Sequence, residues 1–592
     1  MSGLVGLVNG HAVARDLVRA LTRLDERGYD SAGFAVAGPG FAVRKVAGPS
    51  TTLSNKLIDL EFPGHAGIAN ARWSSSGRPE GRGALPIVWQ GVAVVHNGVI
   101  ENHAALRRDL RAAGHSFETD TDSEVMPHLI ADARAAGASP VGAVRTACAQ
   151  MQGAYAIAVL FADAPDRVLV ACCGTPLLVA RGAGGTSVAS DAAILARLAD
   201  DYATLEDGDV AELTGQAIRI SDREGAPVIR QWRGLGAPDR GAMPVGDGFE
   251  YHTRREIAAQ PRALRRTDTG LRGLVLPDAV AAAERVLILA AGSAVHAADA
   301  ARGWIEQFCG LPCEVEAASA WRDRQAPLAR GTVAVLVCRT GDNGDTVACQ
   351  HMLNARDVPT VAVVPPGAPL VREAALTWPV QTGPELGVTA TKSFTAQLLA
   401  LLRFGATLGA ARGALDSAGV QAAELAFADA WLVAALTVGA EARFVTIASH
   451  IARAEQVIVT GRGWGAALAQ EAALKLAQLA NVNAVAVPAG ELRYGAMAMV
   501  RPGVPVLVLA SADQNLSKTA ANAEQMRARG GHVMALAEAS CSVSLGHAVN
   551  DIVALPGRGL PQMFAQAVAV QLIAYQTALA LGHDVDRPHN LV

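Results

Sequence analysis

Several polar residues in the N-terminal part of the chain have the types that hold an α-amino acid. His96-Asn97-Gly98 follows an apolar run, and Asn and Gly at a strand end can offer a side-chain amide and a backbone N–H to a developing oxyanion. Arg72 can clamp a carboxylate through two parallel hydrogen bonds, and Asp122 can bind an ammonium group. Taken alone, an HNG sequence is more often a turn, and a single arginine is usually part of a surface ion pair. Together they predict a site for an amino acid such as glutamine.

The elements around these residues predict an α+β domain. Short β-like runs occupy residues 1 to about 240, with helical stretches near 11–27, 101–113 and 122–152. Strand groups interrupted by helices are typical of layered sheets. The Gly- and Pro-rich segment 233–248 reads as a linker, and a helix is expected directly after it.

The spacing of apolar runs in the sequence changes from about residue 280. Apolar runs at 286–292, 332–341 and 360–366 alternate with helix-like stretches, and the pattern restarts at 456–463, 504–511 and 532–538. Alternation of this kind predicts parallel, doubly wound sheets. Each half opens with a strand, a glycine and a helix, so we expect two tandem copies of one α/β fold, the second beginning near residue 435.

Composition excludes several classes of function. The 592 residues carry a net charge of −4, which provides no basic field for nucleic acid or an anionic membrane. Cys309 and Cys313 have metal-like spacing but no second pair, so no metal site is expected. The short, uncharged start and the pattern of apolar residues lead us to expect neither a secretory leader nor an apolar run long enough to span a bilayer. Scattered thiols fit a reducing compartment, so a cytoplasmic protein without a cofactor or a membrane partner is expected.

Motifs along the whole chain resemble those of the glucosamine-6-phosphate synthase family, the isomerising glutamine:fructose-6-phosphate aminotransferases. RGYDSAG, RW, HNG, RREIAAQP, EAALKL, AGELRYG and DRPHNL occur in family order between residues 2 and 592. The resemblance implies an N-terminal-nucleophile glutaminase domain (1–235), a linker (236–275) and two sugar isomerase (SIS) domains (276–430 and 431–592). It also implies glutamine and a phosphorylated sugar as ligands, and a homodimer.

In the family, an N-terminal cysteine thiol attacks the glutamine amide. The matching glutamine-binding residues are Arg72 for the carboxylate, Asp122 for the amine, Asn97 and Gly98 for the oxyanion, and Trp73 as the gate of an ammonia channel. Ser2 stands at the position of the nucleophile, and a hydroxyl is a far poorer nucleophile than a thiol near neutral pH. Ser2 is an engineered substitution, a natural serine nucleophile, or a sign that glutaminase activity is lost. The family's Thr-His pair is replaced here by Ser75-Ser76. This further change favours natural divergence of the sequence over a single engineered substitution.

The phosphate cradles of the family are partly retained. The first turn reads Ala291-Gly292-Ser293-Ala294, with one hydroxyl lost, and the second reads Cys338-Arg339-Thr340-Gly341-Asp342-Asn343. Gly341 allows close backbone approach at a helix N-terminus, and Arg339 adds a cation. A plain strand–helix turn is the alternative. The segment 387–395 keeps Thr389, Thr391 and Lys392, with Ala390 in place of a serine.

The isomerase chemistry is expected to differ more. Gln478 replaces the glutamate that moves a proton between sugar carbons, and an amide is no general base at neutral pH. Tyr494 replaces the ring-opening histidine, and the sequence ends at Asn590-Leu591-Val592, before the position of the Schiff-base lysine. Glu471 and Lys475 form either a local ion pair or an acid–base couple, and a desolvated Lys475 could form an imine.

These observations predict a divergent, glutamine-dependent sugar-phosphate aminotransferase with altered chemistry. Two alternatives stay open. One is a pseudoenzyme that binds a sugar phosphate or an active paralogue, and the other is an ordinary glucosamine-6-phosphate synthase.

Overall fold

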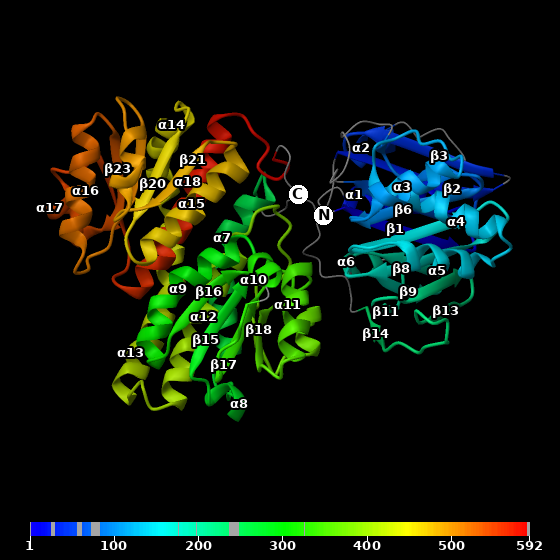
Figure 1. Ribbon diagram of the computed structural model, residues 1–592. Coiled ribbons are helices and arrows are strands. Elements are labelled where there is room, and N and C mark those ends of the chain that lie inside the picture. The colour runs from blue at the N-terminus through cyan, green and yellow to red at the C-terminus, as the bar shows by residue number, and fades with distance from the viewer. Residues whose placement is uncertain are drawn as a thin grey trace. The chain divides into compact units, whose positions relative to one another are not determined.

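The computed structural model divides the chain into two compact units, residues 1–243 and 244–591. It describes residues 2–24, 30–38, 40–55, 62–72, 83–175, 177–196, 198–235, 248–324 and 326–588. Each unit is shown in Figure 1. Trp73, Ser75-Ser76, residues 236–247 of the expected linker and the last residues of the chain lie outside the described ranges.

Two antiparallel sheets form the centre of the N-terminal unit. Alternating apolar residues on both sheets enclose one shared core, with Leu4, Ile68 and Val170 among its fully buried members. The eight-stranded sheet has the order β14 (Trp232–Gly234), β11 (Asp201–Thr204), β9 (Leu178–Gly182), β10 (Gly185–Ala189), β1 (Gly3–Asn9), β4 (Ala66–Arg72), β2 (Ser31–Gly38), β3 (Gly40–Ala47). The six-stranded sheet has the order β13 (Ile218–Ser221), β12 (Val210–Thr214), β8 (Ala164–Cys173), β7 (Tyr155–Phe161), β6 (Val92–Gly98), β5 (Ile87–Trp89).

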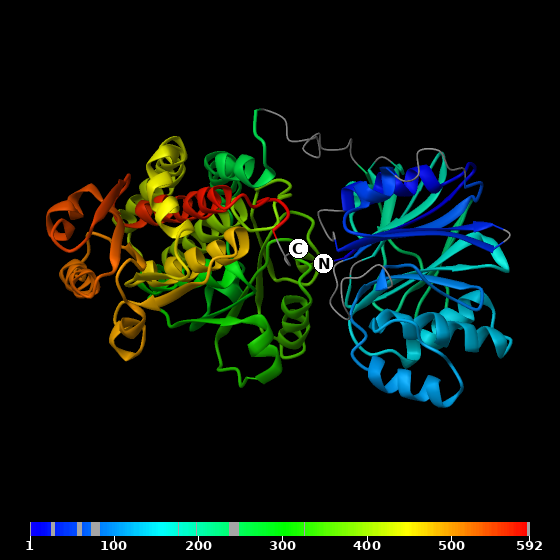
Figure 2. The ribbon, with the colours of Figure 1, turned by 90° about the horizontal axis from the view of Figure 1, so that it is seen from above.

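Helices cover the outer faces of both sheets. Helices α1 (Ala14–Leu24) and α2 (Ser50–Asn55) pack on the eight-stranded sheet, while α4 (Val125–Ala135) and α5 (Pro140–Gln150) pack on the six-stranded one, with α3 (His103–Ala112) against α4. Figure 2 shows these layers from the side. The expected α+β domain of layered sheets is therefore confirmed.

The C-terminal unit contains two five-stranded parallel sheets of identical order. The first is β16 (Cys313–Ala317), β15 (Arg285–Ala290), β17 (Thr332–Val337), β18 (Thr360–Val364), β19 (Leu376–Pro379). The second is β21 (Ala484–Pro488), β20 (Val457–Gly461), β22 (Pro505–Leu509), β23 (His532–Glu538), β24 (Asp551–Leu555). The predicted pair of tandem α/β copies is confirmed.

The two copies match in backbone detail. Gly292 precedes α9 (Ser293–Cys309) with φ +58°, and Gly463 precedes α15 (Trp464–Ala480) with φ +54°. Both helices have 17 residues and end at a left-handed residue, Gly310 or Asn481. This positive φ, which favours glycine, turns each chain from the strand directly into the helix.

Helices lie on both faces of each parallel sheet. One continuous core joins the copies through α9, α15, α12 (Lys392–Ala411) and α18 (Leu560–Ala580). The opposite faces carry α10 (Ala318–Arg324) and α11 (Gly344–Asn354) in the first copy and α16 (Leu516–Ala528) and α17 (Ser542–Leu545) in the second. Helices α7 (His252–Leu271) and α13 (Ser417–Gly439) pack together, α14 (Val445–Ala452) packs on α18, and α8 (Asp278–Ala281) precedes β15.

The expectation that no apolar run reaches membrane-spanning length was wrong. Helices α12, α13 and α18 are each long and apolar enough to cross a bilayer by length and composition. Their Ala, Gly and Thr content hides them in a search for runs of large apolar residues. The apolar windows of α12 and α18 are 83% buried inside the unit, so these two are core helices, whereas that of α13 is 33% buried.

Close packing of α9 on α12 depends on a glycine, which yields a stability prediction. A Cβ at Gly409 would lie 2.1 Å from the carbonyl oxygen of Phe308, whereas one at Gly303 would meet no atom within 4 Å. We expect Gly409→Ala to lower the free energy of unfolding of this unit by about 1–3 kcal/mol. Gly303→Ala, the matched control, should raise it by about 0.5–1 kcal/mol. Calorimetric melting of the full chain measures both, and equal melting temperatures would contradict the packing argument.

Candidate functional site

Ser2 lies at the same end of the central sheet as Arg72. Strand β1 begins at Gly3, which pairs with Ala71 of β4, and Arg72 is the last residue of β4. Asn70, two residues before Arg72 on the same face of the strand, donates to the carbonyl of Gly3 at 3.1 Å. The sheet register therefore brings the predicted nucleophile position and the predicted carboxylate clamp to one edge.

Asn70 fixes the orientation of Asn97. Its Nδ2 lies 3.1 Å from the Gly3 carbonyl, 3.3 Å from the His96 carbonyl and 2.9 Å from Asn97 Oδ1. Because carbonyl oxygens only accept, the Asn70 atom facing them is the amide nitrogen, and the Asn97 atom facing it is the oxygen. The amide nitrogen of Asn97 is thus left as the donor, which is the orientation that an oxyanion needs. Sequence reasoning missed Asn70, although its spacing from Arg72 on an alternating strand was a usable signal.

Gly98 adopts a backbone conformation that excludes other residues. Its φ is +119°, and a Cβ there would lie 2.0 Å from the carbonyl oxygen of Ala154 on the neighbouring chain segment. Gly98 ends strand β6 and is exposed, beside the buried Asn97. The two predicted oxyanion residues are therefore adjacent at a strand end.

Arg72 and Asp122 are buried together. Arg72 donates to the carbonyl of Gly83 at 2.9 Å and contacts the hydroxyl of Thr121 at 3.4 Å. Asp122 accepts the N–H of Ile100 at 2.9 Å and the Thr121 hydroxyl at 3.3 Å. Burial lowers the pKa of Arg72, and the Asp122 carboxylate opposes that shift. A cation and an anion held this close suit the two charged ends of an amino acid.

The loop that carries Asp122 is fixed by Glu124 and Arg107. Glu124 accepts the N–H groups of Glu118 and Thr119 at 2.7 and 2.8 Å. Arg107 donates to the carbonyls of Thr119 and Thr121 at 2.7 and 2.6 Å. Charge-assisted bonds of this kind hold the loop in place before any ligand arrives.

His96 is a neutral residue beneath the pocket. It is 3% exposed, its Nδ1 lies 2.9 Å from the Ser123 hydroxyl, and burial lowers its pKa to about 4. Asp122 raises this pKa and Arg72 lowers it, but neither outweighs burial. His96 is therefore uncharged at neutral pH, and its role is to hold Ser123.

The buried His96 makes the N-terminal unit sensitive to acid. The unfolded chain binds a proton below about pH 6.5 while the folded chain resists it to about pH 4, so stability falls as the pH drops through this window. We expect His96→Asn to remove about 2–3 kcal/mol of that loss between pH 6.5 and 4.5. Urea-dependent hydrogen exchange of β6 and β7 measures it. His65→Asn, at an exposed position, is the control, and parallel pH dependence of all three proteins would contradict the assignment.

In the C-terminal unit, the predicted phosphate residues lie where the strand order reverses. The chain runs from β15 to β16 on one side of the sheet and from β17 to β18 on the other side. Ligands of open α/β sheets bind in the crevice outside the carboxyl ends of the strands at such a point. Gly292 and Ser293 follow β15, and residues 338–343 follow β17. The structure therefore brings these two segments together.

The second segment is tied to a third loop. Cys338 Sγ accepts the N–H of Gly341 at 3.1 Å, and Asn343 caps α11 through the N–H of Thr346 at 3.1 Å. Arg339 donates to the carbonyl of Val388 at 3.1 Å. Thr340 bonds Asp342 of its own turn. The Arg339 contact places loop 384–391 beside the predicted cradle.

That third loop and the first turn of α12 hold buried polar atoms without a partner among the described residues. Glu385 accepts the N–H groups of Thr391 and Ser393 at 2.9 and 3.1 Å. Among the described residues, nothing bonds the hydroxyls of Thr389 and Ser393 or the second oxygen of Glu385. Thr389 and Ser393 are 1% and 3% exposed. Buried polar groups without a bond are costly, so a polar ligand at this loop would relieve them.

Glu256 stabilises the same loop and was not predicted as a site residue. Its carboxylate accepts the N–H of Leu386 and, at 3.1–3.2 Å, that of Gly387. Burial and the nearby Glu385 raise its pKa to about 8, although the positive charge of Lys392 acts to lower it. Its position in the RREIAAQP motif was the available signal.

Glu471 and Lys475 form a fully buried ion pair. Their side chains are 0% exposed, with Nζ 2.9 Å from Oε1. Lys475 also donates to Ser293 of the first copy and to Gln478, both at 2.9 Å. Burial opposes ionisation of Glu471, but Lys475 and a bond from His296 outweigh it and lower the pKa of Glu471. Three oxygen atoms of the protein thus lie 2.9 Å from Nζ, two as hydrogen-bond acceptors and one as the ion-pair partner.

Tyr494 is not brought to this cluster within the chain. It lies in the short helix Leu492–Tyr494 and is 85% exposed. Thr391, by contrast, is buried, and its carbonyl accepts from Gln571 at 3.2 Å.

The matching crevice of the second copy is occupied by the protein itself. Glu538 is 3% exposed and accepts the N–H groups of Ala512 and Gly559 at 3.3 and 3.4 Å. By sheet register, Ala512 corresponds to Thr340 and Glu538 to Pro365 of the first copy. A carboxylate thus accepts from the backbone that matches the predicted phosphate cradle of the first copy, and it would repel a phosphate there.

We therefore expect one sugar-phosphate site per chain. Calorimetric titration with fructose 6-phosphate should give one bound ligand. Arg339→Ala should weaken binding by at least about tenfold, because a charge-assisted contact is lost. Arg462→Ala, which changes the arginine after β20 at the matching crevice of the second copy, is the control and should leave affinity within about twofold. Two bound ligands, or equal weakening by both variants, would contradict the assignment.

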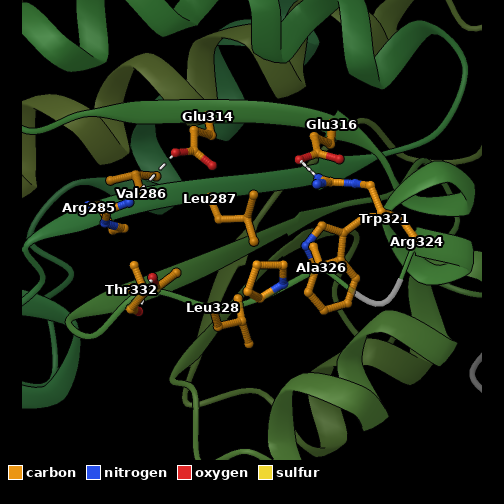
Figure 3. A pocket seen from close by; sticks show the side chains of 12 residues that line it. Arg285, Val286, Leu287, Glu314, Glu316, Trp321, Arg324, Ala326, Leu328 and Thr332 are labelled. Atoms are coloured by element: carbon orange, nitrogen blue, oxygen red, sulfur yellow. Dashed lines mark hydrogen bonds and ion pairs between the residues drawn. The ribbon is translucent and has the colours of Figure 1, made fainter.

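A separate cavity of about 440 Å³ lies at the opposite edge of the first sheet, where β15 and β17 begin (Figure 3). Its charged walls are already paired, since Arg324 bonds Glu316 and Arg285 lies 3.7 Å from Glu314. None of the predicted site residues lines it, so it does not belong to the candidate site.

Comparisons with known proteins agree with this architecture. The family description "glutamine amidotransferase domain" matches residues 76–197, and "SIS domain" matches residues 280–405 and 450–581. The glutamine–fructose-6-phosphate aminotransferase (isomerizing) of Bradyrhizobium diazoefficiens is 36% identical, over 100% of this chain and 99% of that one. The enzyme of the same name from Zymomonas mobilis is 35% identical over the same shares. Among solved structures, the C-terminal domain of glucosamine-fructose-6-phosphate aminotransferase from Francisella tularensis matches with a TM-score of 0.56 and 26% identity, covering 58% of this chain and all of that one.

Proposed function

This chain belongs to the glutamine–fructose-6-phosphate aminotransferase (isomerizing) family, and on that premise we propose a divergent member with altered chemistry. Its N-terminal unit binds glutamine and its C-terminal unit binds a phosphorylated sugar. The groups at Ser2, Gln478 and Tyr494 differ from the reacting groups that the family uses.

The glutamine pocket is the best supported part of this proposal. Arg72 and Asp122 are adjacent and buried, and Asn70 orients Asn97 as a donor beside Gly98. Preorganised donors of this kind stabilise an oxyanion without reorganisation. A protein that no longer used the pocket would have little reason to keep a buried arginine and a positive-φ glycine there.

The contact of Gln478 with Lys475 carries the proposal of altered chemistry. The Gln478 amide oxygen accepts from the buried ammonium at 2.9 Å. Gln478 can therefore replace a carboxylate as a hydrogen-bond partner, but it cannot accept a proton from carbon. An acceptor reaction without proton transfer between sugar carbons, such as direct imine formation on a keto sugar, is compatible with this residue.

The ordinary synthase reaction is a second candidate. It is favoured by the identity of 34–36% over the full length with enzymes that carry that name. The two candidates differ in whether amino sugar phosphate is formed at a normal rate from glutamine and fructose 6-phosphate.

Release of glutamate from glutamine tests the N-terminal chemistry. We expect little release by the wild-type chain and at least about tenfold more by Ser2→Cys, because a thiol gives a far stronger nucleophile near neutral pH. Ser2→Ala is the matched control and should stay inactive. Glutamine should raise the melting temperature of all three proteins by mass action.

The possible outcomes separate the candidates. No stabilisation by glutamine in any variant would refute the pocket. Normal amino sugar phosphate formation by the wild-type chain would refute altered chemistry and leave the ordinary synthase. Binding of both ligands without turnover in Ser2→Cys combined with Gln478→Glu would favour a pseudoenzyme.

A further inference from the structure

Hydrogen bonds and one ion pair of the C-terminal unit form a chain of side chains from the surface to the predicted sugar site. His296, in the first turns of α9, has a 19% exposed side chain, and its Nδ1 lies 2.9 Å from Glu471 Oε2. The other oxygen of Glu471 lies 2.9 Å from Lys475 Nζ. Lys475 in turn bonds Ser293, directly after the Gly292 turn.

The members of this chain come from both copies of the fold. Ser293 and His296 belong to α9 of the first copy, and Glu471 and Lys475 belong to α15 of the second. The two buried members have no exposed side-chain surface, whereas His296 has some. The imidazole and the carboxylate therefore form a path of side chains by which a proton from water can reach Lys475.

Other charged groups near His296 do not interrupt the chain. Asp299 lies one turn further along α9 and is paired with Arg302 at 3.6 Å. Helix α12 also packs on α9, but its Lys392 bonds the carbonyl of Pro384 and its Arg403 bonds Asp268 and Glu424. The contact that orients the imidazole is therefore the one with Glu471.

We propose that His296 and Glu471 form a proton relay that protonates Lys475 again after Lys475 has given a proton to the sugar. The inference rests on the proposed sugar-phosphate site. Lys475 acts on the sugar through the Ser293 hydroxyl that it bonds, and His296 and Glu471 are positioning residues that act through Lys475. No role in catalysis had been expected for His296 from the sequence.

The step that uses the relay is loss of water from the adduct of ammonia and a keto sugar. The C–O bond breaks, its electron pair leaves with oxygen, and the nitrogen lone pair forms the C=N bond. Lys475 supplies one proton to the leaving oxygen and becomes neutral, while the product iminium carries the positive charge. Glu471 then takes a proton from the His296 imidazolium, and a half-turn of the carboxyl group delivers it to Lys475. His296 regains a proton from hydronium in the solvent, so the net step consumes one solvent proton, whose positive charge remains on the iminium.

Substitution of His296 by asparagine tests the relay in the full chain. An Asn side chain can keep the hydrogen bond that Nδ1 makes to Glu471, but it carries no transferable proton. With fructose 6-phosphate as probe and ammonium chloride as nitrogen donor, Ser2 is not needed. We expect kcat to fall by at least about tenfold with KM for the sugar within about twofold. The part of the kcat–pH profile that follows imidazole ionisation should disappear.

Two further proteins separate a relay from a structural role. Added imidazole should restore turnover to His296→Ala by at least about fivefold, which repair of packing would not do. His351→Asn, at an exposed histidine of α11, is the matched control and should behave as wild type.

Each outcome of these experiments leads to one conclusion. Wild-type turnover and an unchanged pH profile in His296→Asn overturn the relay and leave the proposed function standing. Equal loss of sugar affinity and turnover, without rescue by imidazole, also overturns it in favour of a structural role. A wild-type chain that binds the sugar phosphate without turning it over refutes the relay alone, and one that does not bind it refutes the proposed function and the relay together.

Discussion

The C-terminal unit depends on the buried ion pair between Glu471 and Lys475. Removing two charges from water costs several kcal/mol each, and their attraction offsets this only when further hydrogen bonds satisfy both groups. Ser293, His296 and Gln478 supply these bonds. Because two of them belong to the first copy and one to the second, the pair also fixes the register of α9 against α15. The predicted phosphate turn at Gly292 is therefore positioned by charges that lie about 180 residues further along the chain.

Much of the fold was predictable because the decisive patterns are local. The central strands of both parallel sheets are continuous apolar runs, and each glycine that opens a helix stands directly after its strand. The four strands absent from the sequence analysis are β16, β19, β21 and β24, which are the edges of the two sheets. An edge strand is buried on fewer sides, so it tolerates polar residues such as Glu314 and Glu316 and loses the apolar signature.

The candidate sites were predictable in their residue types but not in their supporting contacts. Arg72, Asp122, Asn97 and Gly98 could be proposed because each offers a distinctive group. Asn70 and Glu256 could not be found in this way, since their value lies in which backbone groups they meet. Glu471 and Lys475 left two interpretations open in the sequence. The structure shows them as a fully buried ion pair at 2.9 Å, and the neighbouring contact reveals His296, which is 175 residues from its partner.

The exchange at position 478 has an electrostatic consequence beyond the loss of a base. In this chain the buried cluster holds one carboxylate, one ammonium and one neutral amide, so its charges balance when His296 is neutral. A carboxylate at 478, which the resemblance implies for the family, would add a negative charge with a single ammonium between two anions, and like charges in a buried site cannot all stay ionised without another cation. Gln478 removes that demand and stabilises the cluster without ligand. Proton exchange by the cluster then depends on Lys475 and its link to His296. Glutamine at 478 thus favours stability of the empty site, whereas a carboxylate there would favour isomerisation.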